Sequence, residues 1–213
     1  MTMSNRWVAG VFVLTVGLVG CQGSGQMYNF TPHALSGSPV PSEGFQDDSL
    51  KILVQPFQDK RMNQERIGSR THLGGGATHF NVWNGKVGEG MADLAVEYLQ
   101  QRKWQAVRAP SEGDATTKIP GDVILTGEVL NLEANGKSGP GFTNIEVKMK
   151  VGFEAKNTID GSTVRMVLGA NGSDSVLIFD PTDIEELTNL VAKDLFTQLF
   201  RDLTVKDKKF SLK

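Results

Sequence analysis

The stretch Phe142–Lys156 reads FTNIEVKMKVGFEAK and carries the clearest β-strand pattern in the chain. Apolar and charged residues alternate along it, with Ile145, Val147, Met149, Val151, Phe153 and Ala155 set against Glu146, Lys148, Lys150, Glu154 and Lys156. Successive side chains of a strand point to opposite faces, so the pattern predicts one buried face and one solvated face, as in an antiparallel sheet. We therefore expect the fold to be built around a half-buried sheet.

Further strands are expected on both sides of this stretch. Segments with strand-like apolar patterns beside turn signals are Leu50–Phe57, Trp104–Arg108, Asp122–Glu133 and Thr163–Ala170. Asp160-Gly161 is a hairpin signal before the last of these, and 136–141 reads as a turn region. Arg66–Leu73 and Ala77–Trp83 flank Gly74-Gly75-Gly76, which predicts a hairpin with a glycine tip.

Two amphipathic helices complete the expected fold. Apolar residues recur at helical spacing over Val87–Arg102. A second helix is expected to open at Asp180-Pro181, because aspartate suits the N-cap and proline suits the first helical position. The order of elements predicts an α+β fold, with a mainly antiparallel sheet and two helices packed on one face.

The segment Arg6–Cys21 has the layout of a secretory signal, with a basic start, a short apolar run and small residues before the cysteine. Its last four residues, Leu18-Val19-Gly20-Cys21, resemble the lipobox of bacterial lipoproteins. The resemblance implies cleavage before Cys21 and acylation of that cysteine. Gln22 in place of aspartate resembles the outer-membrane sorting class of Gram-negative lipoproteins, which implies an anchor facing the periplasm.

The expected organisation is a lipoprotein signal peptide over 1–20, a lipid-anchored flexible tether over 21–45, a single α+β periplasmic domain over 46–205 and a basic, frayed tail over 206–213. The tether is expected because Ser, Gly and Pro dominate that segment. The chain has 22 basic and 24 acidic residues, and only Arg6 lies within 1–20. The mature chain is therefore slightly acidic, which is no electrostatic footprint for nucleic acid.

Several segments together resemble a known family. They read ILVQPFQDKR from residue 52, ERIGS from 65, LQQRKWQAV from 99 and GDVILTGEVLNLEA from 121. They resemble the YajG-like bacterial lipoproteins and, more distantly, the LptE, TolB N-terminal and CsgG envelope domains, over residues 50–203. The resemblance implies an α+β envelope lipoprotein with no known reaction chemistry.

Candidates for chemistry are few. His72 and His79 flank the glycine tip and, with Asp59, could ligate zinc in a metal-dependent hydrolase, which needs at least three protein ligands. Two surface histidines on a hairpin are the competing interpretation. The glycines could hold a phosphate, but phosphate loops lead into a helix whereas a strand follows here. The sequence contains no Gly-x-Ser-x-Gly motif, and its one cysteine is Cys21. We therefore expect no catalytic residue, metal or cofactor.

The segment 60–86 is basic in an otherwise acidic chain and contains aromatic residues, which are features of protein interfaces. The candidate partner-binding residues are Arg61, Arg66, Arg70, Phe80 and Trp83. Phe80 and Trp83 could equally point into the core. The leading hypothesis is a non-enzymatic lipoprotein that binds an envelope partner, and the alternative is a subunit of an export or lipid-transport machine. The oligomeric state is left open.

Overall fold

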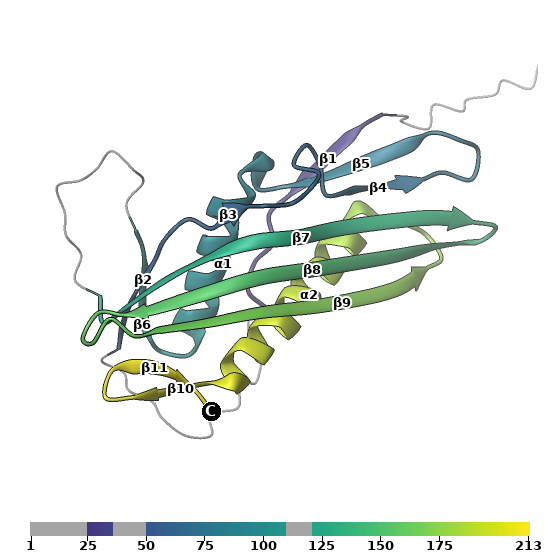
Figure 1. Ribbon diagram of the computed structural model, residues 1–213. Helices are drawn as coiled ribbons and strands as arrows, with labels where there is room; N and C mark the ends of the chain where they lie inside the picture. The colour runs from purple at the N-terminus through teal and green to yellow at the C-terminus, as the bar shows by residue number, and fades with distance from the viewer. Residues whose placement is uncertain (1–24, 36–49, 110–120) are drawn as a thin grey trace, which may run out of the picture.

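The computed structural model describes residues 25–35, 50–109 and 121–213 (Figure 1). Its helices are α1 (Val87–Gln101), α2 (Pro181–Asp202) and a single 3-10 turn, η1 (Trp83–Gly85). Its strands are β1 (Met27–Phe30), β2 (Lys51–Val54), β3 (Gln58–Asp59), β4 (Gly68–Thr71), β5 (Ala77–Val82), β6 (Gln105–Arg108), β7 (Val123–Gly139), β8 (Phe142–Asn157), β9 (Thr163–Val176), β10 (Leu203–Lys206) and β11 (Lys209–Leu212).

The three long strands β7, β8 and β9 form an antiparallel meander. The strand expected over Phe142–Lys156 is β8, and its alternating residues are buried on one face and exposed on the other. The expected turn region 136–141 is wrong in extent, because β7 continues to Gly139 and only residues 140–141 turn. Gly136 stays in the strand, where a Cβ would meet the Arg70 side chain at 3.1 Å.

The other edge of β7 carries three short parallel strands in succession. β2 pairs with it at Val123–Leu125, β3 at Glu128–Val129 and β4 at Gly136–Lys137. β6 extends the sheet beyond β2, while β5 and β1 extend it beyond β4, giving nine strands in the described residues. The α+β class is confirmed, but the expectation of a mainly antiparallel sheet is wrong because the sheet is mixed.

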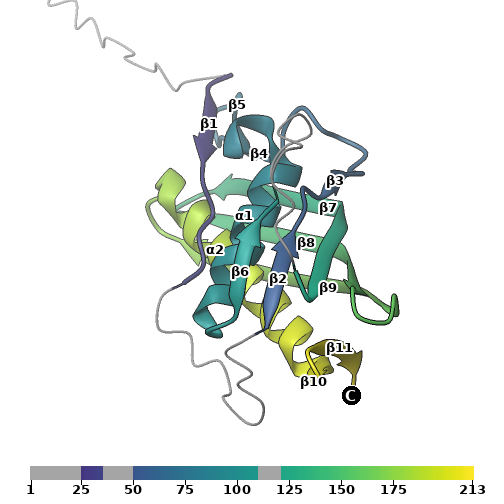
Figure 2. The same ribbon diagram turned by 90° about the vertical axis from the view of Figure 1, so that its left-hand side faces the viewer.

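Both helices lie against one face of the curled sheet, as Figures 1 and 2 show. Aromatic rings join the layers: Tyr98 of α1 stacks on Phe196 of α2 with ring centroids 4.5 Å apart, and Phe153 of β8 meets Phe196 edge-on at 5.7 Å. Such pairs add about 0.5–1.5 kcal/mol beyond their area burial. The core therefore lies between the sheet and the helices, and among the described residues the outward side chains of β8 and β9 are largely exposed.

The second helix begins as its sequence predicts. The Asp180 side chain accepts a hydrogen bond from the Thr182 amide at 2.9 Å, and the Asp183 carboxylate accepts one from the Asp180 amide at 2.7 Å. Pro181 occupies the first turn. This reciprocal capping box satisfies two of the amide groups that a helix start leaves unpaired.

Part of the segment predicted to be a tether belongs to the fold. Met27–Phe30 forms β1, which pairs in parallel with β5 from Met27↔His79 to Phe30↔Val82, and Phe30 is buried. The Ala34 amide then donates to Glu97 of α1 at 2.7 Å. The signal peptide, Cys21 and residues 36–45 lie outside the described residues, so those expectations stay predictions.

The C-terminal segment is not the frayed tail that its lysines suggest. β10 and β11 form a hairpin in which Phe210 is buried, with its ring centroid 5.4 Å from that of Trp104. The Asn157 side chain bonds to both the N–H and the C=O of Phe210, at 2.8 and 2.9 Å. Two buried contacts therefore fasten this hairpin to β8 and to the connection between α1 and β6. Among the described helices, none has the length and apolar character needed to cross a bilayer.

Candidate functional site

The candidate site lies where the edge of β7 is left without a strand partner. Beyond β3, the Lys60 amide donates to the Val129 carbonyl at 3.0 Å, and the chain then leaves the sheet. It returns at Ile67, whose carbonyl accepts from the Ala134 amide at 2.9 Å. A bulge between Val129 and Asn131 bends β7 in the same place. Within the described ranges, no strand pairs with residues 130–133 on this side.

The loop that spans this gap is fixed by a buried ion pair. Arg61 donates to both carboxylate oxygens of Asp59, through Nε at 2.9 Å and Nη2 at 2.8 Å. Its side chain is 2% exposed and that of Asp59 is 20% exposed. Gln64 donates to the Asp59 carbonyl at 2.9 Å, and Asn81 of β5 donates to the Glu65 carbonyl at 3.3 Å. The loop is therefore held in place by side chains at both ends.

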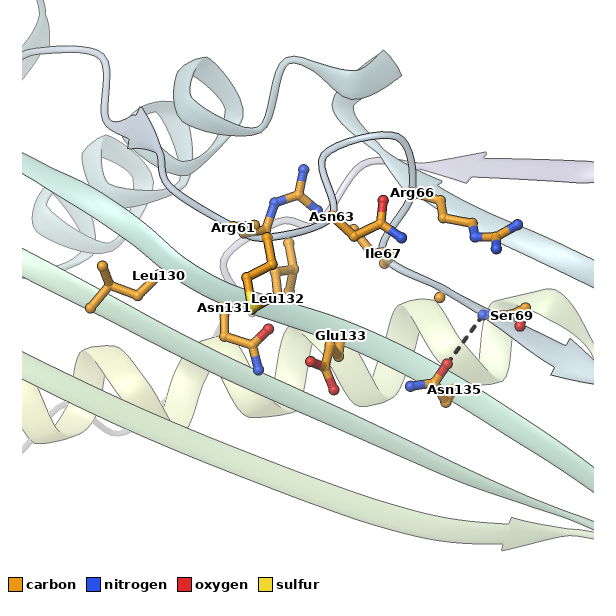
Figure 3. Close-up of a pocket in the computed structure, with 12 residues that line it drawn as sticks. Arg61, Asn63, Arg66, Ile67, Ser69, Leu130, Asn131, Leu132, Glu133 and Asn135 are labelled. Atoms are coloured by element: carbon orange, nitrogen blue, oxygen red, sulfur yellow. Dashed lines mark hydrogen bonds between the residues drawn. The ribbon is translucent and has the colours of Figure 1, made fainter.

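Between this loop and β7 lies a pocket of about 500 Å³ (Figure 3). Its polar lining comprises three amide side chains, one carboxylate, two arginines and one serine, from Asn63, Asn131, Asn135, Glu133, Arg61, Arg66 and Ser69. Met62, also in the lining, is fully exposed. The Asn135 side chain accepts from the Ser69 amide at 3.2 Å, which closes one end. Amides can donate and accept together, so the lining suits a ligand that presents both kinds of group, such as a peptide backbone.

Three of the five predicted partner-binding residues are buried. Arg61 is 4% exposed and is engaged by Asp59, and Figure 3 shows its guanidinium group pointing away from β7. Phe80 is fully buried, and Trp83 is 9% exposed with its ring against Gly90 of α1. The interpretation of Phe80 and Trp83 as core residues therefore holds. The reason is local, since Phe80 and Val82 share the inward face of β5.

The other two predicted residues are half-buried and already bonded. Arg66 lies 3.1 Å from Nδ1 of His79, and its guanidinium group points toward the hairpin rather than across the pocket (Figure 3). Arg70 donates to the Ser138 hydroxyl at 2.9 Å and stacks over the Phe179 ring at 4.2 Å. Burial lowers the pKa of Arg70. Both arginines brace the β4–β5 hairpin, and only Arg66 also lines the pocket.

The structure does not bring the suggested zinc ligands together. The His72 ring contacts the Thr78 hydroxyl at 3.0 Å, His79 contacts Arg66, and Asp59 is held by Arg61. No group of three or more His, Cys, Asp or Glu side chains able to hold a metal occurs in the described part of the chain. Gly74–Gly76 forms the tip of the predicted hairpin, closed by the His72 amide donating to the Gly76 carbonyl at 3.1 Å.

Sequence reasoning missed the pocket residues, including Asn63, Asn131 and Glu133. They come from two segments about 70 positions apart, and the gap between them exists only because β3 and β4 both pair with β7. The bulge at Val129–Asn131 has one faint signal, since Val129, Leu130 and Leu132 break the alternation of apolar residues. No spacing rule links that irregularity to a loop upstream.

Comparisons with known proteins yield distant structural likenesses. No family model matches the chain, and no curated protein matches it. Among solved structures, protein XCC0632 from Xanthomonas campestris, of family DUF330, matches with a TM-score of 0.48 and 10% identity over 82% of this chain and 92% of its own. The PelC dodecamer subunit from Paraburkholderia phytofirmans matches with a TM-score of 0.41 and 16% identity over 70% and 88%. Lipoprotein GNA1162 from Neisseria meningitidis matches with a TM-score of 0.37 and 11% identity over 69% and 98%. None of these likenesses identifies a family for the chain, and the resemblance to YajG-like lipoproteins stays a prediction.

Proposed function

We propose that this protein is a lipid-anchored lipoprotein of the cell envelope that acts as a non-enzymatic binding or assembly factor. The lipobox at Leu18–Cys21 supports the anchor, and Gln22 supports placement at the outer membrane facing the periplasm. The pocket beside β7 supports binding, because it places polar and apolar side chains together beside an unpaired stretch of strand.

The pocket next to the unpaired segment of β7 carries this proposal. Main-chain groups of a strand alternate sides with a period of two residues. The Ala134 amide faces the loop, so the N–H and C=O of Leu132 face the same side. An extended peptide from an envelope protein can bond to such an edge while the lining amides bond to its backbone, a recognised mode of peptide capture. Exposed Met62 supplies a flexible apolar contact at the rim.

Site-specific photocrosslinking in cells tests the proposal. A photoreactive residue replaces Met62 at the pocket, and a matched control replaces Val167, which is 61% exposed on the outer face of β9. We expect a discrete adduct with an envelope protein from position 62 and none from position 167. The same adduct yield from both positions, or none from position 62, would rule out the pocket as the binding site.

A second candidate function is a subunit of an export or lipid-transport machine. The observation that favours it is β9, a 14-residue strand with no strand partner on its far side in the described residues. An unpaired edge can join copies of a chain edge to edge, although Gln198 of α2 already donates to the Gly169 carbonyl there at 3.3 Å. Ring-shaped assemblies of the detergent-purified protein, seen by electron microscopy, would favour this function over the first.

A further inference from the structure

One row of paired residues crosses the sheet near the tip of the β4–β5 hairpin. Ala77 pairs with Thr71, Thr71 with Lys137, Lys137 with Asn144, and Asn144 with Ser175. Beyond this row lie the ends of β7, β8 and β9 together with three connections between elements, over 72–76, 138–143 and 176–180. In Figure 1 these connections lie at the end of the molecule where the arrowheads of β7 and β9 point. We call them the apolar end.

The apolar end carries one formal charge, on Asp180, and exposes large apolar side chains. Its three segments read HLGGG, SGPGFT and VLIFD, so Asp180, the N-cap of α2, is their one charged residue in a chain that is 22% charged. Ile178 is 89% exposed, Leu177 83%, Leu73 66% and Phe142 43%. Three of these are among the four most exposed large apolar residues in the described part of the chain. A cluster of this kind marks an interaction surface rather than scattered surface residues.

The opposite end of the molecule has a different character. It comprises the β8–β9 turn, which carries Asp160, and the β10–β11 turn, which reads Lys206-Asp207-Lys208-Lys209. Ile159 is also exposed there, at 60%, but it stands near the ion pair of Asp160 with Lys209 at 3.1 Å. The molecule is therefore polarised along its long strands, with several charged residues at one end and only Asp180 at the other.

The chain enters the fold at the apolar end. The Gly25 amide donates to the Ala77 carbonyl at 2.7 Å, which fixes Gly25 beside the first residue of this row of paired residues. Only Gln22, Gly23 and Ser24 separate Gly25 from Cys21. Fully extended, these four steps span at most about 14 Å. A lipid on Cys21 can therefore reach a bilayer only if the apolar end lies close to that bilayer.

We propose that the apolar end docks directly on the lipid surface, so that Leu73, Phe142, Leu177 and Ile178 enter the interfacial region of the bilayer. This inference rests on the proposed lipid anchor at Cys21. Segments with one charged residue, Asp180 at the start of α2, can approach a bilayer at little cost of desolvating ions, and apolar side chains gain from leaving water. The anchor and the docking surface then act as two membrane contacts on one rigid end.

Fluorescence quenching tests the docking surface separately from natural acylation. The chain from Cys21 to Lys213 is prepared with Ile178→Trp, and its single thiol is coupled to a maleimide phospholipid in phosphatidylcholine vesicles with brominated acyl chains. Trp83 and Trp104 are buried and give a constant background. We expect a loss of emission and a blue shift from the new tryptophan. The matched control, Ile159→Trp at the charged end, should keep its emission.

If the Ile178→Trp variant emits as strongly in brominated vesicles as in ordinary ones, as the Ile159→Trp control should, the proposed docking surface is wrong. If Ile178→Asp instead converts an oligomer to a monomer in light scattering without vesicles, this end joins protein copies and the lipid assignment is wrong. Mass spectrometry of the protein isolated from its host shows whether Cys21 is acylated. An unmodified cysteine there would refute the natural anchor, while the coupled vesicles still decide whether the apolar end faces lipid.

Discussion

Arg61 shows how one buried charge shapes the wall of the pocket. Its guanidinium group is almost inaccessible to water, and Asp59 supplies both oxygens that compensate for its burial. In the part of the chain that the structure describes, its Nη1 atom has no hydrogen-bond partner. The pair therefore stabilises the loop only while both partners are present, since an uncompensated buried charge is costly.

We expect Asp59→Asn to lower the free energy of unfolding by about 3–5 kcal/mol, because it leaves Arg61 buried without a counter-charge. The matched control is Asp93→Asn, which breaks the ion pair between Arg108 and an Asp93 side chain that is 62% exposed. That exposed pair should contribute about 0–1 kcal/mol. Urea denaturation followed by circular dichroism measures both, and equal effects would show that burial is not what makes the Asp59 pair matter.

Asp160 gives a second prediction at this scale, on acid stability. Hydrogen bonds from Ser162 and Lys209 lower the pKa of its exposed carboxyl group from 3.8 to about 2. A lowered pKa in the folded state stabilises the fold above pH 3.8, and this contribution disappears as the pH falls toward 2. The urea midpoint of the unmodified protein should therefore fall as the pH drops through this window, and Asp160→Asn should make that fall smaller. In Ser162→Ala, nuclear magnetic resonance titration should find the Asp160 pKa closer to 3.8, and an unchanged value would contradict the assigned cause.

At the scale of elements, local pattern accounts for β8, the glycine-tipped hairpin and both helices. Each of these is decided by neighbours in sequence, such as the alternation from Ile145 onward or the cap at Asp180. β1 was missed because four residues, MYNF, stand in a segment rich in Ser and Gly, and their partner β5 lies about 50 positions away. The parallel pairing of β3 and β4 with β7 is equally non-local. The pocket follows from that pairing, so it could not be predicted either.

The β10–β11 hairpin was missed because its lysines hide a short apolar pattern. Phe210→Ala should destabilise the protein by about 3–5 kcal/mol, since a buried aromatic ring is replaced by a cavity beside Trp104. Leu212→Ala is the matched control, because Leu212 is 54% exposed in the same strand and should change stability by less than about 0.5 kcal/mol. Thermal unfolding measures the difference, and a harmless Phe210→Ala would mean that the hairpin frays in solution.

At the scale of the whole molecule, the apolar end and the pocket share one strand, β7. β7 runs from the pocket residues Asn131–Glu133 to Lys137, which belongs to the row of paired residues that borders the apolar end. At about 3.3 Å per residue, this separates them by about 13–20 Å. With the apolar end on a bilayer, the pocket would face a partner held close to the membrane rather than one far from it.

The anchor itself gives the prediction at this scale. Cys21→Ala removes the proposed acylation site, so the variant should incorporate no radiolabelled fatty acid and should leave the membrane fraction. Cys21→Ser is a closely isosteric companion that should behave in the same way. Label retained by either variant would place the lipid on another residue and refute Cys21 as the anchor.

The parallel pairing of β1 with β5 has a mechanical consequence. A pull on the chain at Gly25, directed along β1, loads the hydrogen bonds between Met27–Phe30 and His79–Val82 in shear, so that they resist together. In a hairpin pulled open from its ends, the bonds would instead break one after another. Behind β1, the bond from Ala34 to Glu97 of α1 adds a second fastening. The first strand of the fold thus acts as a force-bearing clamp, through which tension from a membrane would pass into the sheet without unzipping it.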